Sequence, residues 1–228
     1  KNVSLMIISS FITIYSIEVI ISMMNISGKT VEEERQNVAN KLGIHFDTRS
    51  KLEVLEYLRR DGKKVYPVLH GAYYLENELK LPGGQTVVPL SNSSNNAVLF
   101  CNESGKFITY TSDNYGFRNS NKIYQEEIDI ALLGDSFVEG ACVEENEMLG
   151  FHLSAQVDKN VWNLGGSGNG PLLEWAIFRE YIEAKKPKKV FWFYYEGNDF
   201  KNLKKEMRSK LLMKYINEDY TQGLMSKN

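Results

Sequence analysis

The sequence predicts an α/β fold whose core is a parallel sheet built from βαβ units. Three short apolar runs that favour strands alternate with two longer segments of helical character, and this alternation implies parallel strands joined by crossover helices. Each apolar run ends in glycine or polar residues, a pattern typical of the strand ends at which open parallel sheets bind ligands. The expected strands are 128–133, 161–164 and 189–195, and the expected helices lie within 144–157 and at 171–184.

The first element along the chain is an apolar segment long enough to cross a bilayer. Residues Val3 to Met24 include a single charged side chain, Glu18, and a membrane-spanning helix needs ~20 mostly apolar residues. We therefore expect residues 1–25 to form a transmembrane helix or signal anchor that attaches the protein to the membrane. A signal peptide and a buried helix remain as alternatives, and the flanking charges do not determine the orientation.

Residues 26–125 are expected to form a mixed region with helices and a β-hairpin. Helical spacing extends from Thr30 to Leu42 and from Arg49 to Arg60. The first of these helices opens with the capping-box pattern, in which Thr30 is followed three residues later by Glu33. The expected hairpin strands are 97–100 and 107–111.

The segment Asp113–Asn119 leads towards the first strand of the core and contains aromatic, arginine and asparagine side chains. This composition would suit a loop beside an active site, which makes Arg118 a candidate for substrate binding. The plainer interpretation is a turn with Gly116 at positive φ and Arg118 paired with a surface acid. We favour the plainer interpretation and keep Arg118 as a candidate.

Three polar motifs stand where the core strands are expected to end. The first strand ends at Gly134-Asp135-Ser136, the second runs from Asn163 into a glycine-rich turn that includes Gly168, and the third ends at Asn198-Asp199. A serine hydroxyl can attack a carbonyl carbon, and amide N–H groups can stabilise the oxyanion that forms. The sequence therefore predicts an acyl-transfer site at this edge of the sheet.

The order of these motifs resembles the SGNH (GDSL-like) hydrolase family over residues 126–200: Gly-Asp-Ser, then Asn-x-Gly with a glycine five residues after the Asn, then Asn-Asp. The resemblance implies the SGNH hydrolase fold, an α/β architecture with a flavodoxin-like parallel sheet. It also implies that Ser136 is the nucleophile and that its own amide, the amide of Gly168 and the side chain of Asn198 form the oxyanion hole. Glu196 departs from the family pattern, because a glycine is usual at that position.

Other side chains of the three motifs are expected to shape the substrate site. Asp135 and Asp199 should stabilise their turns by accepting hydrogen bonds from nearby backbone amides. Asn163 should brace the glycine turn that follows it. Together with Arg118, these residues form the predicted substrate-binding set.

The fourth block of the family, Asp-x-x-His, supplies the general base, and the sequence has no match to it. The three histidines are His45, His70 and His152, and none of them follows Asn198. His152 is the nearest substitute, but a helical rise of ~1.5 Å per residue would place it too far from the serine. We therefore expect residues 126–228 to be an SGNH hydrolase-like domain that is incomplete at its C-terminus, in a chain that is a fragment.

Composition and spacing argue against several other kinds of site. The formal net charge is −2, whereas nucleic-acid binding needs clustered basic residues, and the one dense basic run, Lys185–Lys189, is expected to be a solvated turn. The glycines after the second core strand fit neither the dinucleotide pattern G-x-G-x-x-G nor the esterase pattern G-x-S-x-G. Histidines and cysteines are too scattered for a metal site, so we expect neither a metal nor a cofactor.

The two cysteines, Cys101 and Cys142, leave two alternatives open. They could pair as a disulfide in an oxidising compartment. A lone pair of cysteines is also compatible with two buried thiols. We favour the thiols.

These observations together predict a membrane-anchored serine esterase or O-acyltransferase whose catalytic domain is periplasmic or extracellular. Ser136 would attack an ester carbonyl, and water or a sugar hydroxyl would accept the acyl group. By family resemblance, the substrate is an ester-bearing small molecule, a cell-surface polysaccharide or a lipid. The alternative is a non-catalytic carbohydrate-binding or assembly module that keeps the SGNH fold.

Overall fold

The structure is a computed structural model that describes residues 2–23, 30–217 and 219–226. The chain divides into two compact units, Lys1–His45 and Phe46–Asn228. Residue 125, at which a domain boundary was expected, falls inside the second unit. Residues 46–125 and the predicted catalytic region therefore belong to one compact body.

In the first unit, the described residues form helices α1 (Asn2–Met23) and α2 (Val31–Leu42). The predicted capping box of α2 is confirmed: Thr30 Oγ1 accepts a hydrogen bond from Glu33 N, and the Glu33 carboxylate accepts one from Thr30 N. The helix ends at Gly43, whose φ of +67° lies in the left-handed region that glycine adopts without a Cβ penalty. Local sequence signals thus define both ends of α2.

The membrane anchor predicted from Val3–Met24 is wrong. Within the described part of the chain, no helix combines the length and the apolar composition that crossing a bilayer requires. Met24 lies outside the described residues. In α1, hydroxyl side chains and Glu18 interrupt the apolar residues, and the Ser10 and Thr13 hydroxyls donate to backbone carbonyls one turn earlier. The predicted localisation depended on this anchor and is not supported either.

The second unit begins with a helix and two small sheets. Their elements are α3 (Lys51–Arg60), β1 (Val65–Pro67), β2 (Leu79–Lys80), β3 (Thr86–Val87), β4 (Ala97–Leu99) and β5 (Thr109–Thr111). Strands β4 and β5 pair antiparallel, which confirms the predicted hairpin, and β1 pairs parallel with β4. Strands β2 and β3 form a separate antiparallel pair. Helix α3 starts from a capping box between Ser50 and Glu53.

A parallel sheet of three strands follows. Its strands are β6 (Ile130–Leu133), β7 (Val161–Asn163) and β8 (Lys189–Trp192), in the order β7-β6-β8. The helices that accompany it are α4 (Ser136–Glu139), α5 (Leu149–Val157), α6 (Pro171–Ile177), α7 (Glu183–Lys185), α8 (Asp199–Glu206) and α9 (Lys210–Asn217). A π-helical segment, η4 (Phe178–Ile182), joins α6 to α7. Single 3-10 turns are η1 (Gly71–Tyr74), η2 (Asn121–Tyr124), η3 (Glu145–Glu147) and η5 (Leu224–Ser226).

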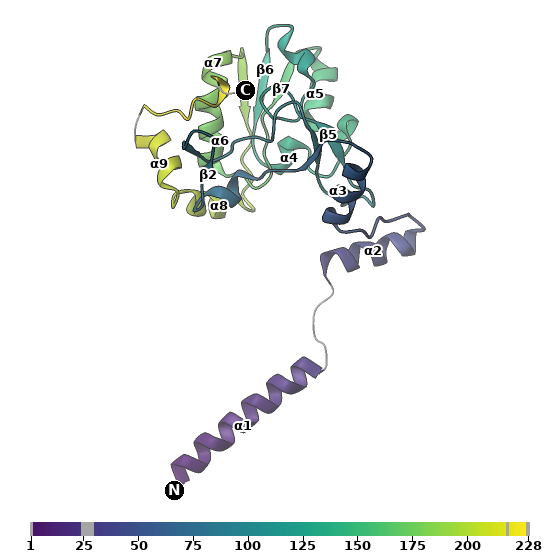
Figure 1. Ribbon diagram of the computed structural model, residues 1–228, viewed down its shortest axis with the longest axis vertical. Coiled ribbons are helices and arrows are strands. Elements are labelled where there is room, and N and C mark those ends of the chain that lie inside the picture. The colour runs from purple at the N-terminus through teal and green to yellow at the C-terminus, as the bar shows by residue number, and fades with distance from the viewer. Residues whose placement is uncertain (1, 24–29, 218, 227–228) are drawn as a thin grey trace. The chain divides into compact units, whose positions relative to one another are not determined.

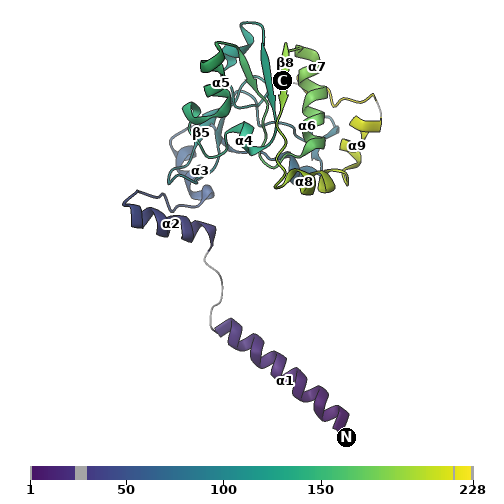
Figure 2. The same cartoon turned by 180° about the vertical axis from the view of Figure 1, so that it is seen from behind.

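Helices cover both faces of this sheet. Alternate side chains of β6 point to opposite faces: Ile130 and Leu132 pack with Leu153 of α5, whereas Ala131 and Leu133 belong to the large core cluster that includes α6. Figure 1 shows α5 and α6 on opposite sides of β6 and β7, and the reverse view in Figure 2 shows α6 and α7 beside β8. Burial on both faces explains why the β6 sequence is continuously apolar.

The predicted flavodoxin-like sheet is wrong as a description of the fold. Among the described residues there are three small sheets: β2-β3 is antiparallel, β1-β4-β5 is mixed, and the parallel sheet has three strands. The strands before residue 112 pair with one another instead of extending the parallel sheet. After β8, residues 199–217 form α8 and α9. The parallel strands therefore remain a small part of a mixed architecture.

Candidate active site

Ser136 lies on a tight turn between β6 and α4, as the sequence predicts. Asp135 Oδ1 accepts a hydrogen bond from Phe137 N at 3.0 Å, which confirms the expected turn-stabilising contact. Gly134 permits the turn, because a Cβ at this position would approach Val138 Cγ2 to 2.6 Å. The side chain of Ser136 is half-buried, whereas Asp135 is buried.

The glycine turn after β7 packs directly against α4. Asn163 Oδ1 accepts from Gly165 N at 2.9 Å and Asn163 Nδ2 donates to Val138 O at 2.7 Å, so Asn163 braces the turn as predicted. A Cβ on Gly165 would overlap the backbone of Glu139, and glycine alone allows this close approach. Gly168, at the far end of the turn, is exposed and has a φ of +79°. Its amide therefore lies at the accessible end of a tightly held turn.

Asn198 lies beside the Asp135 turn. Asn198 Nδ2 donates to Asp135 Oδ2 at 3.4 Å, a long hydrogen bond that links the ends of β6 and β8. Asp199 Oδ2 accepts from Tyr195 N at 2.6 Å, which confirms its expected turn contact, and burial raises the pKa of Asp199. Within the described part of the chain, Asn198 Oδ1 and Asp199 Oδ1 are buried without hydrogen-bond partners.

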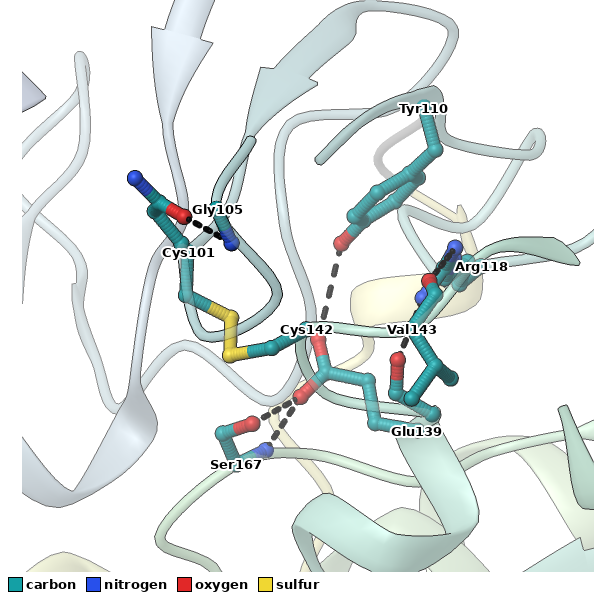
Figure 3. The surroundings of a disulfide bond; sticks show 10 residues. Cys101, Gly105, Tyr110, Arg118, Glu139, Cys142, Val143 and Ser167 are labelled. Atoms are coloured by element: carbon teal, nitrogen blue, oxygen red, sulfur yellow. Dashed lines mark hydrogen bonds between the residues drawn. A yellow bond between two sulfur atoms is a disulfide. The ribbon is translucent and has the colours of Figure 1, made fainter. Parts of the chain in front are cut away.

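A buried carboxylate that the sequence analysis did not identify joins α4 to the glycine turn. Glu139 Oε2 accepts from both the amide and the hydroxyl of Ser167 at 2.5 Å, and Glu139 Oε1 lies 3.5 Å from the hydroxyl of Tyr110 (Figure 3). Burial raises the pKa of Glu139 to about 7, against the Ser167 hydrogen bonds and the nearby Arg118, which lower it. Glu139 thus fixes the turn relative to the helix that begins at Ser136.

Arg118 is buried beside this network. Its guanidinium donates to the carbonyl oxygens of Gly140 at 2.5 Å and Val143 at 2.8 Å, and not to the surface acid that the sequence suggested. The guanidinium also lies over the ring of Tyr110, 5.0 Å from its centroid. Gly116 has a φ of +87°, as expected for the turn. Arg118 therefore holds the segment that follows α4, and its role in substrate binding stays a prediction.

Cys101 and Cys142 form a disulfide bond, so the preference for two buried thiols is wrong. The two Cα atoms are 5.1 Å apart although the residues are 41 positions apart in sequence, because the hairpin of β4 and β5 lies beside the segment that follows α4 (Figure 3). Sequence spacing carries no sign of this proximity. The bond attaches the region before residue 125 to the chain just beyond the Ser136 helix.

His70 is the histidine that contacts this site, and the sequence analysis did not select it. Its Nδ1 atom lies 2.9 Å from Ser167 O, across 97 positions of sequence. Because a carbonyl oxygen only accepts hydrogen bonds, Nδ1 carries the hydrogen. Burial lowers the pKa of His70, which favours the neutral ring. A Cβ on Gly168 would lie 3.7 Å from Ala72 Cβ, so the segment that carries His70 lies against the glycine turn.

The other two histidines lie elsewhere. His152 is exposed on α5 and its ring contacts that of Phe151, whereas His45 belongs to the first unit. Among the described residues, no group of three or more His, Cys, Asp or Glu side chains is placed to hold a metal ion.

No family model, curated protein or solved structure matches the chain. The functional inference therefore depends on the arrangement of the site. Ser136, a half-buried residue, follows the central strand β6, and the segments after the two flanking strands carry the glycine turn and Asn198. A nucleophile flanked by N–H donors suits attack on a carbonyl group.

Proposed function

We propose that the protein is a serine esterase or O-acyltransferase in which Ser136 is the nucleophile. The observation that carries the proposal is that hydrogen bonds link the three segments that follow β6, β7 and β8. Glu139 joins the Ser136 helix to the turn that contains Gly168, and Asp135 joins the Ser136 turn to Asn198. The resemblance of these motifs to the SGNH hydrolases supports the same assignment of roles.

The chemistry follows from these roles. Ser136 Oγ attacks the ester carbonyl, whose oxygen becomes an oxyanion stabilised by the amides of Ser136 and Gly168 and by Asn198 Nδ2. An asparagine amide has two hydrogens, so Asn198 can bond to Asp135 and to the oxyanion at once. The alcohol then leaves, and water or a sugar hydroxyl takes the acyl group from the serine. The proton of Ser136 passes to a general base, which the resemblance implies is a histidine.

Hydrolysis of p-nitrophenyl acetate by the natural full-length protein tests the proposal. Ser136→Ala should lower kcat by at least ~10³-fold, since removal of a nucleophile leaves only the binding and oxyanion contributions. Ser154→Ala is the matched control, because this serine lies on α5 and its hydroxyl bonds only locally, to Lys159 O. Equal turnover by Ser136→Ala and the unaltered protein would contradict the proposal.

One observation favours a second candidate, a carbohydrate-binding module. A groove of about 1000 Å³ lies between β5, the 118–126 segment and α5. Its lining is rich in hydroxyl and amide side chains and includes two aromatic rings, groups that suit a sugar chain, together with three glutamates and two basic side chains. The hydroxyl, amide and aromatic residues include Thr109, Thr111, Ser120, Asn121, Tyr110 and Phe151. This candidate predicts glycan binding that Ser136→Ala leaves unchanged, together with no ester cleavage by either protein.

A further inference from the structure

The peptide between Ser167 and Gly168 carries two groups that point in opposite directions. In a trans peptide the carbonyl of one residue and the N–H of the next are antiparallel and lie in one plane. The N–H of Gly168 is the oxyanion donor of the proposed function. Whatever holds the carbonyl of Ser167 therefore also sets the direction of this N–H.

His70 holds the carbonyl side of this peptide. Its Nδ1–H donates to Ser167 O at 2.9 Å, and a peptide whose carbonyl accepts a hydrogen bond becomes a better N–H donor. The backbone next to His70 is also held, because Leu69 N donates a hydrogen bond to Asn92 Oδ1 at 2.6 Å. The hydrogen bond thus connects the glycine turn to the region that precedes the parallel sheet.

Glu139 holds the other side of Ser167. Its Oε2 atom accepts both the backbone N–H and the hydroxyl of Ser167, and the carboxylate is buried between the turn and Tyr110 (Figure 3). Since Glu139 is the last residue of α4, which Ser136 begins, this contact sets the turn relative to the nucleophile. Ser167 is therefore fixed at its amide, its hydroxyl and its carbonyl.

We propose that His70 and Glu139 are positioning residues that clamp the Ser167–Gly168 peptide so that the Gly168 N–H points at the oxyanion. The inference rests on the proposed function, which supplies the oxyanion. In it, neither side chain touches the substrate. His70 acts through its Nδ1 donor and Glu139 through its acceptor oxygen, while Ser136 and the Gly168 amide act on the ester.

Two matched pairs of variants test the clamp in the full chain. His70→Asn keeps an N–H donor near the position of Nδ1, whereas His70→Leu removes the donor at similar size. Glu139→Gln keeps an acceptor oxygen, whereas Glu139→Met removes it. Two quantities are measured for each: kcat and KM for p-nitrophenyl acetate, and the hydrogen-exchange rate of backbone amides in residues 165–169.

The Leu and Met variants should lower kcat by ~10- to 100-fold with little change in KM, because a misdirected oxyanion donor acts on the transition state. They should also speed exchange at residues 165–169. The Asn and Gln variants should keep both quantities near those of the unaltered protein. If Glu139→Met fails to fold, the His70 pair decides, because His70 is only half-buried.

Three results would overturn the clamp. One is a normal kcat in His70→Leu, and another is unaltered exchange at residues 165–169 in that variant. The third is His70→Asn being as inactive as Ser136→Ala with normal exchange, which would mean that His70 acts through Nε2. Failure of the proposed function is distinct: the unaltered protein and Ser136→Ala would then show equal turnover, while the exchange rates still report whether the side chains hold the turn.

Discussion

The segments that follow β7 and β8 each carry one of the three predicted oxyanion donors, the Gly168 amide and Asn198, and they are built differently. The turn after β7 lies on α4, and it is held by hydrogen bonds to Asn163 and Glu139 and by one that His70 donates. The end of β8 makes a long hydrogen bond from Asn198 to Asp135. Among the described residues, Asn198 Oδ1 and Asp199 Oδ1 are buried here without hydrogen-bond partners, as is Asn169 Nδ2 beside the β7 turn.

The same contrast extends along the strands. Leu164, directly after β7, is fully buried in the large core cluster. By contrast, the five consecutive aromatic residues 191–195, which begin in β8, are each at least 40% exposed, although β7 and β8 are both edge strands of the described sheet. Side chains from distant parts of the chain therefore hold the turn that contains Gly168, whereas Asn198 follows a more exposed strand.

The largest expected effect separates the two donors. Asn198→Ala should lower kcat for ester cleavage by ~10²- to 10³-fold, as loss of one oxyanion donor does. Exchange at residues 165–169 should stay unaltered, because the glycine turn is held by other side chains. Asn217→Ala, at an exposed asparagine on α9, is the control. Normal kcat in Asn198→Ala would remove β8 from the site.

Removing the disulfide tests how much the link between the region before residue 125 and the segment after α4 contributes to stability. Cys101→Ser with Cys142→Ser should lower the free energy of unfolding by ~2–4 kcal/mol, because the cross-link restricts the unfolded chain. Denaturant titration of the double variant measures this change. The unaltered protein in reductant should show the same loss, and an unchanged midpoint in both would contradict it.

The pH dependence of the free energy of unfolding depends on a buried carboxyl group beside the β7 turn and on another beside β8. Burial raises the pKa of Glu139, beside the β7 turn, to about 7 and that of Glu174, which accepts from Trp192 Nε1 of β8, to about 8, from a usual value of 4.5. A group with a higher pKa in the folded state binds its proton more tightly there, so deprotonation destabilises the fold. Stability should therefore fall as pH rises from 4.5 to about 8.

Single substitutions separate the contributions of Glu174 and Glu139 to this loss of stability. Glu174→Gln should flatten the fall near pH 8, and Glu139→Gln should flatten it near pH 7, each by ~1–3 kcal/mol over the whole range. Urea denaturation at pH 5 to 9 gives the slopes. Glu206, whose pKa burial also raises to about 7, contributes to the slope that remains. A slope that neither substitution alters would refute these assignments.

The smallest expected effect lies on the exposed aromatics. Tyr194→Ser should change the free energy of unfolding by less than ~0.5 kcal/mol, because this side chain is 53% exposed. Leu164→Ala, at the buried end of β7, should lower it by ~2–5 kcal/mol. Equal effects in thermal or denaturant unfolding would show that the two strand ends do not differ in packing.

Local patterns predicted several local features of the chain well. The apolar run before Gly134, the capping box at Thr30 and the hairpin of β4 and β5 each depend on residues close in sequence, and each is confirmed. The prediction that Asn163 braces its turn is confirmed as well: Gly165 N donates to Asn163 Oδ1, and the two residues are two positions apart in sequence.

Features that depend on distant segments were missed or wrong. His70 meets Ser167 across 97 positions, Glu139 meets it across 28, and the disulfide spans 41. The periodic spacing of apolar residues predicts helices and strands but gives no information on contacts between distant segments. The prediction of a flavodoxin-like sheet was wrong for a related reason: strand pairing also joins distant segments, and the strands before residue 112 pair with one another. The membrane anchor was wrong although Glu18 was noted, because the hydroxyl side chains and Glu18 leave α1 with too little apolar composition for a membrane span.

Labelling with a fluorophosphonate tests the central claim, that Ser136 is a nucleophile between two oxyanion donors, most directly. The reagent leaves a covalent adduct on an activated serine, and mass spectrometry of the digested full chain locates it. The account predicts one adduct, on Ser136, which is absent from Ser136→Ala and forms more slowly in Asn198→Ala. Absence of an adduct on Ser136, or labelling of another serine that persists in Ser136→Ala, would contradict it.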